Sequence, residues 1–282
     1  MNNHSIMKVL DFVKGLKAPI YFTSISPVLI GWAFSQFRLS YLVLLLLVVT
    51  VSMQAGMNLG MDYFDHLNSR PLRNDDTLFP IGSFFIERLN VRPTILRSSF
   101  FVLIAVATAV GLLVVFLTKS FLLLYLGLGA VFLSLLYVIP PIKLGARGIG
   151  EIATFFSFGP FPVIGTIIAL NAQITLESIF ISIGLGLLAS SIRYLHHLPE
   201  DREGGTRVRH FRTVYPIMIV TASIMISAFR TMEIASVIVF IASLAHLVFL
   251  PRTPLKISRR TNIIVGIHFL FTLAVILSLL LL

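Results

Sequence analysis

The sequence contains no cysteine, and this absence excludes several kinds of chemistry. Disulfide bonds, thiolate nucleophiles and cysteine-ligated metal sites all need the missing thiol, although its absence leaves the compartment undetermined. Charged residues are also scarce, at 12% of the chain against about 25% in ordinary soluble domains. Because 57% of the residues are hydrophobic and the mean hydropathy is +0.95, the sequence predicts an integral membrane protein.

Nine apolar segments follow one another along the chain, and each is near the ~20 residues that a helix needs to cross a bilayer. Such segments form helices because the hydrocarbon offers no other partner for their backbone polar groups. We therefore predict an all-α bundle of nine transmembrane helices in a single membrane domain, residues 1–282, in which residues 1–18 form an interfacial helix. The predicted spans are 19–37, 40–61, 94–118, 120–138, 152–171, 176–196, 213–229, 232–250 and 261–282.

Basic residues divide unevenly between the two sides of this predicted bundle. Arg38, Lys119 and Arg230 lie on one side, whereas the other nineteen of the 22 lysines and arginines lie on the opposite side. The positive-inside rule then places the N-terminus in the cytoplasm and the C-terminus outside. The net charge of +10 is mostly an orientation signal and an attraction for anionic lipid headgroups, and it gives no reason to infer nucleic-acid binding.

Acidic residues gather on the same cytoplasmic side, although the positive-inside rule does not govern them. Of the 12 acids, only Glu177 and Glu233 fall on the outer side. The other ten are concentrated in the loops after the second and sixth predicted helices. Ten acids on one face need a reason other than topology.

The first acidic stretch reads QAGMNLGMDYFD and lies at the end of a long aliphatic run. Gln54, Asn58 and Asp62 follow at i, i+4 steps, with Asp65 three residues further on, so a helix would place all four on roughly one face. Two carboxylates and a carboxamide are hard oxygen ligands, suited to a Mg2+ ion that also binds a phosphate. The alternative is that Asp62 and Asp65 simply begin a solvated loop.

The second acidic stretch, SIRYLHHLPEDREGG, repeats this spacing weakly through Arg193, His197 and Asp201. Two helices of one bundle could therefore deliver acids to the same cytoplasmic mouth. His196 and His197 are adjacent, so their side chains point about 100° apart on a helix and cannot both face one ion. For the two histidines we favour the interpretation that they are interfacial polar residues.

Between the two acidic stretches, the loop 137–151 is rich in proline and glycine. A tight loop would hold Lys143 and Arg147 near the membrane surface, where they can meet the oxygens of a diphosphate. The next predicted span contains the helix breakers Gly159 and Pro160. Breakers at this depth are tolerated where a helix is packed or lines a cavity, which favours a large apolar pocket.

Four pieces of the chain, in order, carry a resemblance to a known family: LKAPIYFTSISPVLIG, the NxxxDYFD stretch, PPIKLGARGIGE with its continuation FGPFPVIGT, and LPEDREGG. Together they resemble the UbiA superfamily of intramembrane prenyltransferases. Within it, the sequence is most similar to the 1,4-dihydroxy-2-naphthoate polyprenyltransferases of menaquinone synthesis. The similarity covers most of the chain through about residue 215 and is thin beyond it.

The resemblance implies a central cavity that opens toward the cytoplasm and to lipid, and transfer of an isoprenyl chain from a prenyl diphosphate to a small aromatic acceptor. It also implies Mg2+ held by two acid-rich motifs, the first formed by Asn58, Asp62 and Asp65 and the second by Asp201 with Glu200 or Glu203. The diphosphate would be bound by Arg70, Arg73, Lys143, Arg147, Arg202 and Arg207. Asp62, Asp65 and Asp201 would be the main catalytic residues, and Tyr137 and Glu151 are further candidates for positioning the acceptor.

The sequence departs from the family pattern in both motifs. Met61 and Ser69 stand where the first motif usually has an asparagine and a third acid, and glycine takes the place of the last acid of the second. A catalytically weakened homologue is therefore one alternative, and a non-aromatic acceptor such as a glycerol-phosphate ether lipid is another. A transporter or channel would want charged groups at mid-span, and the predicted helix centres contain almost none.

Overall fold

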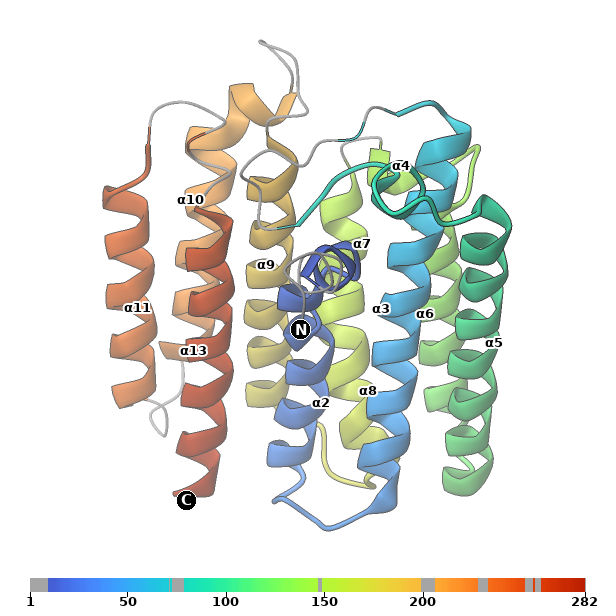
Figure 1. Ribbon diagram of the computed structural model, residues 1–282. Coiled ribbons are helices and arrows are strands. Elements are labelled where there is room, and N and C mark those ends of the chain that lie inside the picture. The colour runs from blue at the N-terminus through green and yellow to red at the C-terminus, as the bar shows by residue number, and fades with distance from the viewer. Residues whose placement is uncertain are drawn as a thin grey trace, which may run out of the picture.

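The computed structural model describes residues 10–70, 72, 79–146, 149–198, 206–227, 233–251, 256 and 260–281. The long elements of these residues are helices, which run side by side as one bundle (Figure 1). The short elements η1 (Ala18–Ile20), α4 (Phe84–Glu87) and η2 (Leu144–Ala146) connect them. The others are α2 (Phe22–Phe34), α3 (Tyr41–Leu67), α5 (Pro93–Thr118), α6 (Phe121–Val138), α7 (Gly150–Phe158), α8 (Pro160–Ala169), α9 (Leu176–His197), α10 (Thr206–Ser227), α11 (Glu233–Val248) and α13 (Thr261–Leu280).

The integral membrane character is confirmed by the length and hydropathy of these helices. Within the described ranges, six helices are long and apolar enough to cross a membrane, with α7 and α8 counted together. The helices Ala18–Phe34 and Ser236–Val248 are apolar but shorter, and α10 is not among the six. Each of the nine predicted segments is largely helical, but nine membrane crossings remain a prediction.

Helix α3 extends beyond the predicted membrane span 40–61. Helix α3 begins after Ser40, whose hydroxyl accepts a hydrogen bond from the Leu42 amide at 3.2 Å. It then continues to Leu67 rather than ending at residue 61, because no glycine or proline interrupts the last seven residues. Asp62 and Asp65 are therefore helical, and with only 2% and 1% of their surface exposed they do not begin a solvated loop.

Helix α9 is the interior helix of the bundle, and 78% of its most apolar window is buried. The broken helix α7–α8 packs on it at very close range. A Cβ atom added to Gly159 would lie 2.4 Å from the carbonyl oxygen of Ser182, and one added to Gly186 would lie 2.6 Å from the carbonyl oxygen of Phe155. The break predicted from Gly159 and Pro160 is confirmed, and glycine is required there because the two backbones nearly touch.

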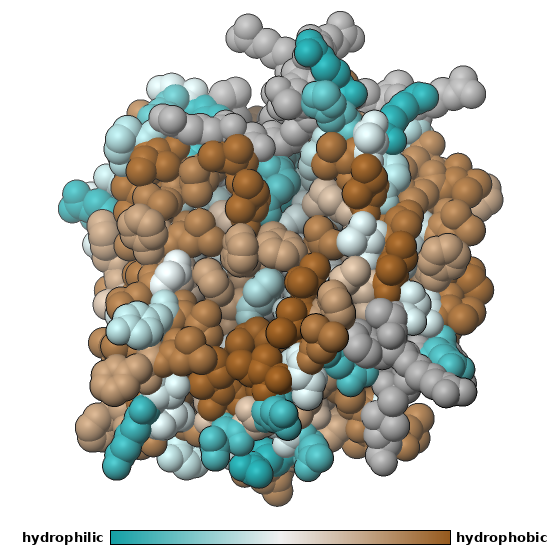
Figure 2. Space-filling model, turned by 180° about the vertical axis from the view of Figure 1, so that it is seen from behind, coloured by the Kyte–Doolittle hydropathy of each residue, from teal (hydrophilic) through white to brown (hydrophobic). Residues whose placement is uncertain are grey.

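The outer surface of the bundle, of which Figure 2 shows one face, is mostly apolar between two more polar ends. Large side chains such as Phe116 and Phe121 are exposed on it, as expected for a surface that faces lipid. Among the buried polar contacts is the hydrogen bond between the Tyr215 hydroxyl and His246 Nε2, at 2.7 Å, which joins α10 to α11. Such interhelical contacts fix neighbouring helices in register within a membrane.

Candidate active site

A cavity of about 320 Å³ lies between α3, α5, α6, the α7–α8 pair and α9. On α3 the residues that line it run from Leu46 to Asp65, which at 1.5 Å per residue corresponds to a depth of about 28 Å. Its walls are mostly apolar, and at the deep end Leu46 packs in a buried cluster with Val114 and Leu123. The cavity thus joins a polar mouth to an apolar space nearly as deep as the hydrocarbon is thick, about 30 Å.

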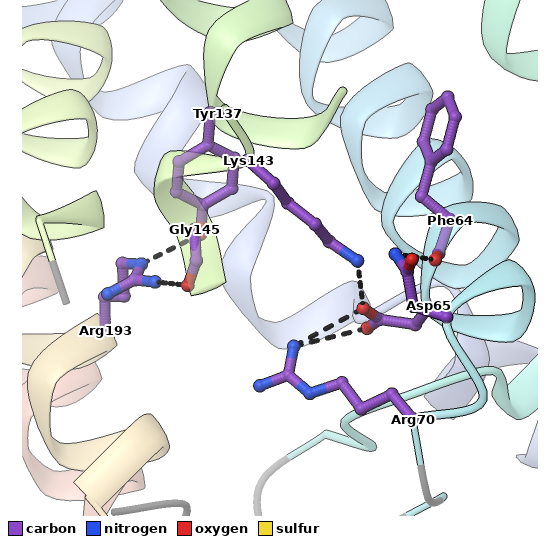
Figure 3. Close-up of polar contacts among 8 residues, drawn as sticks. Phe64, Asp65, Arg70, Tyr137, Lys143, Gly145 and Arg193 are labelled. Atoms are coloured by element: carbon purple, nitrogen blue, oxygen red, sulfur yellow. Dashed lines mark hydrogen bonds and ion pairs between the residues drawn. The ribbon is translucent and has the colours of Figure 1, made fainter. Parts of the chain in front are cut away.

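Asp65 lies at the mouth of this cavity and is held between two cations (Figure 3). Its carboxylate accepts a hydrogen bond from Lys143 Nζ at 2.7 Å and lies 3.4 Å from Arg70 Nη1. Lys143 is itself buried, whereas the side chain of Arg70 is 22% exposed. The structure therefore brings together one predicted metal ligand and two predicted phosphate ligands.

The two carboxamides of the first acidic stretch also line the cavity, one and two turns deeper than Asp62. Asn58 Nδ2 donates to the carbonyl oxygen of Leu16 at 3.4 Å, and Gln54 Nε2 donates to that of Ile20 at 3.1 Å. Gln54 Oε1 in turn accepts a hydrogen bond from the Ser24 hydroxyl. These contacts tie α3 to the beginning of the chain, where the Asn58 side chain is also hydrogen-bonded to that of Tyr21. The carboxamide oxygen of Asn58 is of the type that binds Mg2+.

Asp62 is oriented differently from the other three residues of this stretch. It is not among the described residues that line the cavity, and its Oδ2 atom accepts a hydrogen bond from the Phe85 amide at 2.7 Å. The predicted single polar face is thus split, because Asp62 fastens the segment 79–88 to α3. Phe79 to Gly82 of that segment cover the mouth of the cavity.

Arg193 organises the opposite side of the mouth. Its Nε donates to the Tyr137 hydroxyl at 2.8 Å, its Nη2 donates to the carbonyl oxygen of Gly145, and its Nη1 is paired with Glu151 (Figure 3 shows the first two contacts). Only 6% of its surface is exposed. Arg193 was missed as a site residue by reasoning from spacing, although a charged residue within an apolar helix is by itself a signal of function.

His196 and His197 are buried, with 0% and 7% of their surface exposed, and both line the cavity. They are thus not solvated residues at the surface of the protein, and their position relative to the membrane interface stays a prediction. Their ring planes are at 89° to each other, with 5.2 Å between the ring centroids. The ring of His196 stacks on Phe79 with 3.6 Å between centroids, which packs α9 against the segment that covers the mouth.

Several predicted site residues fall outside the described ranges. They are Arg73, Arg147, Glu200, Asp201, Arg202 and Glu203, and of Arg207 only the backbone, at the start of α10, is described. In the part of the chain that is described, no three His, Asp or Glu side chains come together as a metal site. The first motif offers the oxygens of Asn58 and Asp65 at the cavity mouth, and this donor set fits a Mg2+ ion that takes its remaining ligands from water and phosphate.

The arrangement of helices around this cavity is that of the UbiA proteins, so the resemblance seen in the sequence is confirmed for the fold. A digeranylgeranylglyceryl phosphate synthase described in membranes superposes with a TM-score of 0.66 over 98% of this chain and 100% of its own, at 14% identity. A UbiA homologue from Archaeoglobus fulgidus, bound to DMAPP and Mg2+, superposes with a TM-score of 0.63 over 94% of this chain and 99% of its own, at 13% identity.

At the level of sequence, the chain is similar to a 1,4-dihydroxy-2-naphthoate octaprenyltransferase from Mycobacterium leprae (strain TN). The two are 26% identical over 192 residues, which is 64% of this chain. The match spans 63% of the relative's length. No family model matches the chain.

Proposed function

We propose that this chain is an intramembrane prenyltransferase that transfers an isoprenyl chain from a prenyl diphosphate to an aromatic quinone precursor. The observation that carries the proposal is the buried Asp65, paired with Lys143 and Arg70 at the mouth of a deep apolar cavity. The apolar depth suits the hydrocarbon of the donor, and the charged mouth suits its diphosphate. The UbiA fold and the naphthoate prenyltransferase relative support the same reading.

The charges at the mouth fit a magnesium diphosphate. Lys143 and Arg70 are groups that bind phosphate oxygens, and Asp65 is a group that binds Mg2+, but without ligands they neutralise each other. A diphosphate would take the two cations and a Mg2+ ion would take the carboxylate, so every charge keeps a partner. Because Asp65 and Lys143 are buried away from water, such contacts stabilise charge more strongly than in solution.

In the proposed reaction, the C1–O bond of the donor breaks and its electron pair leaves with the diphosphate. When bound, Mg2+ would neutralise part of the charge that develops on this leaving group. Lys143 and Arg70 bind the leaving diphosphate, while Asp65 and Asn58 provide the oxygen ligands of the metal. The acceptor ring then forms a carbon–carbon bond with the allylic cation and loses a ring proton, which the released diphosphate anion accepts. Tyr137 lines the same cavity, and its hydroxyl accepts a hydrogen bond from Arg193.

A non-aromatic lipid acceptor is the second candidate. The digeranylgeranylglyceryl phosphate synthase superposes on nearly the whole chain, and its name indicates a glycerol-phosphate lipid as a substrate or product.

Reconstituted membranes containing the protein should be supplied with labelled geranylgeranyl diphosphate and either 1,4-dihydroxy-2-naphthoate or geranylgeranylglyceryl phosphate. We expect a labelled lipid product with the naphthoate on thin-layer chromatography, and its loss with a chelator. Product from the glycerol phosphate alone would establish the second candidate, and no product from either would favour an inactive homologue.

We also propose that the mouth faces the cytoplasm and that the C-terminus lies outside. Because the sequence has no cysteine, single introduced cysteines can be labelled specifically with a membrane-impermeant maleimide. Asn68 is exposed at the end of α3 near the mouth, and Leu281 is 85% exposed at the other end of the bundle (Figure 1). Leu281→Cys should be labelled in intact cells, and Asn68→Cys only after permeabilisation. Labelling of both in intact cells would contradict this orientation.

A further inference from the structure

Lys17 is a buried cation that has no role in the proposed reaction. It lies just before η1, and its side chain lines the mouth of the cavity although only 9% of its surface is exposed. Its backbone has a φ angle of 59°, a left-handed conformation that a residue with a side chain adopts at an energetic cost. The backbone of Lys17 is thus locally strained at the residue whose side chain lines the cavity.

The ammonium group of Lys17 differs from the other buried cations of the site. Lys143 is paired with Asp65 and Arg193 with Glu151, whereas the ammonium group of Lys17 makes no ion pair or hydrogen bond with the residues that the structure describes. Its one specific contact is the ring of Phe79, whose centroid is 5.9 Å away.

Asp62 is close enough to interact electrostatically with Lys17, but its carboxylate is hydrogen-bonded to the Phe85 amide instead. A buried charge without a direct partner costs stability, and such a residue usually marks a site where a ligand of opposite charge binds.

We propose that Lys17 binds an oxyanion of the substrate at the mouth of the cavity. Asn58 and Asp65 line the same space, so an anion held there would lie beside the proposed metal ligands. A lysine is a compact point charge that forms charge-assisted hydrogen bonds with phosphate or carboxylate oxygens. The oxyanion is either a phosphate of the prenyl diphosphate or the carboxylate of an aromatic acid acceptor. In both forms the proposal rests on the proposed function.

The test compares Lys17→Met, which keeps an unbranched side chain but removes the charge, with Lys17→Arg, which keeps the charge. Lys14→Met is the matched control, because Lys14 lies one turn earlier and is not among the described residues that line the cavity. Direct binding to the full chain in detergent is measured for inorganic diphosphate with Mg2+, for 1,4-dihydroxy-2-naphthoate, and for 1,4-naphthalenediol, which lacks the carboxylate. Thermal unfolding of each variant without ligand is measured in parallel.

We expect Lys17→Met to weaken the binding of one anion by about tenfold or more, the usual scale for one charged hydrogen bond, while Lys14→Met changes nothing. Loss of diphosphate binding would assign the anion to the donor. Loss of naphthoate binding, with naphthalenediol binding unchanged, would assign it to the acceptor. Lys17→Met should unfold at the same or a higher temperature, because it removes a buried charge, and Lys17→Arg should retain most of the binding.

Wild-type affinity for both anions in Lys17→Met would overturn the proposal. The proposal would also be overturned if Lys17→Met were unfolded while Lys17→Arg folded but bound the anions weakly. Lys17 would then be a structural residue whose ammonium cannot be replaced by another cation. These binding measurements do not depend on turnover. A wild-type protein that binds an anion through Lys17 but transfers no prenyl group would therefore refute the proposed function and leave the assignment of Lys17 standing.

Discussion

Replacing Asp65 by asparagine is expected to reduce prenyl transfer by about a hundredfold or more and to destabilise the protein. The loss of activity follows because a preorganised charged group at a reacting centre typically contributes about 10² to 10³ in rate. The loss of stability follows because Lys143, 2.7 Å away and buried, would be left as an unpaired cation. Breaking a buried pair in this way costs about 3 kcal/mol or more in the free energy of unfolding. Turnover and thermal unfolding should be measured on the same purified protein.

The double variant Asp65→Asn, Lys143→Met separates the two effects. Removing the lysine charge together with its partner should recover much of the stability, while activity stays low because both proposed ligands are gone. Asp11→Asn is the surface control, since Asp11 lies 3.4 Å from the exposed Arg88 and such pairs contribute about 1 kcal/mol at most. If Asp65→Asn retained wild-type turnover, Asp65 would be a structural partner of Lys143 and not a metal ligand.

The helices of this protein were predictable because hydropathy and chain length act locally. Membrane segments must be helical, so an apolar run of sufficient length specifies its own secondary structure. The predicted span 40–61 stops short of the end of α3 for a physical reason. Asp62 and Asp65 lower the local hydropathy and so imitate a loop, but hydrogen bonds and ion pairs with distant residues allow them to remain helical and buried. A hydropathy profile carries no information about such distant contacts.

The candidate site was only partly predictable for the same reason. Spacing along one helix correctly selected Asn58 and Asp65 as residues that share a cavity. It failed for Asp62, because the Phe85 amide that captures its carboxylate lies 23 positions away and no local pattern indicates it. The pairing of Asp65 with Lys143 spans 78 positions. Residue type predicted a diphosphate site that includes both, but the tertiary fold was needed to bring them within 2.7 Å.

The polar mouth is built from the segments that connect the helices as well as from the helices themselves. The N-terminal segment contributes Lys17 and the backbone carbonyl of Leu16, the segment 79–88 contributes Phe79, and the loop before η2 contributes Lys143. Each is fastened to α3 or α9 by buried polar contacts or by a ring stack. We therefore expect variants of these fasteners to affect substrate affinity even when they touch no substrate.

Arg193 is the fastener with the largest expected effect. Its guanidinium holds Glu151 on α7, the hydroxyl of Tyr137 on α6, and the carbonyl oxygen of Gly145 two residues after Lys143. Arg193→Met should lower the free energy of unfolding by about 3 kcal/mol, as expected when one partner of a buried ion pair is lost. It should also raise the KM for the prenyl diphosphate by about tenfold, because a loop displaced by 1 Å no longer aims Lys143 at its partner.

A purely structural role would lower the amount of folded enzyme and leave the KM of the surviving fraction unchanged, so the KM is the decisive measurement. Arg193→Lys should restore part of the stability through its charge but little of the affinity, because an ammonium cannot bind three groups in the planar geometry of a guanidinium. Tyr137→Phe removes one of the three contacts and should cost about 1 kcal/mol. Arg97→Met, at an exposed position on α5, is the control and should behave as the wild type. An unchanged KM in both Arg193 variants would show that the loop holds Lys143 in place without the help of Arg193.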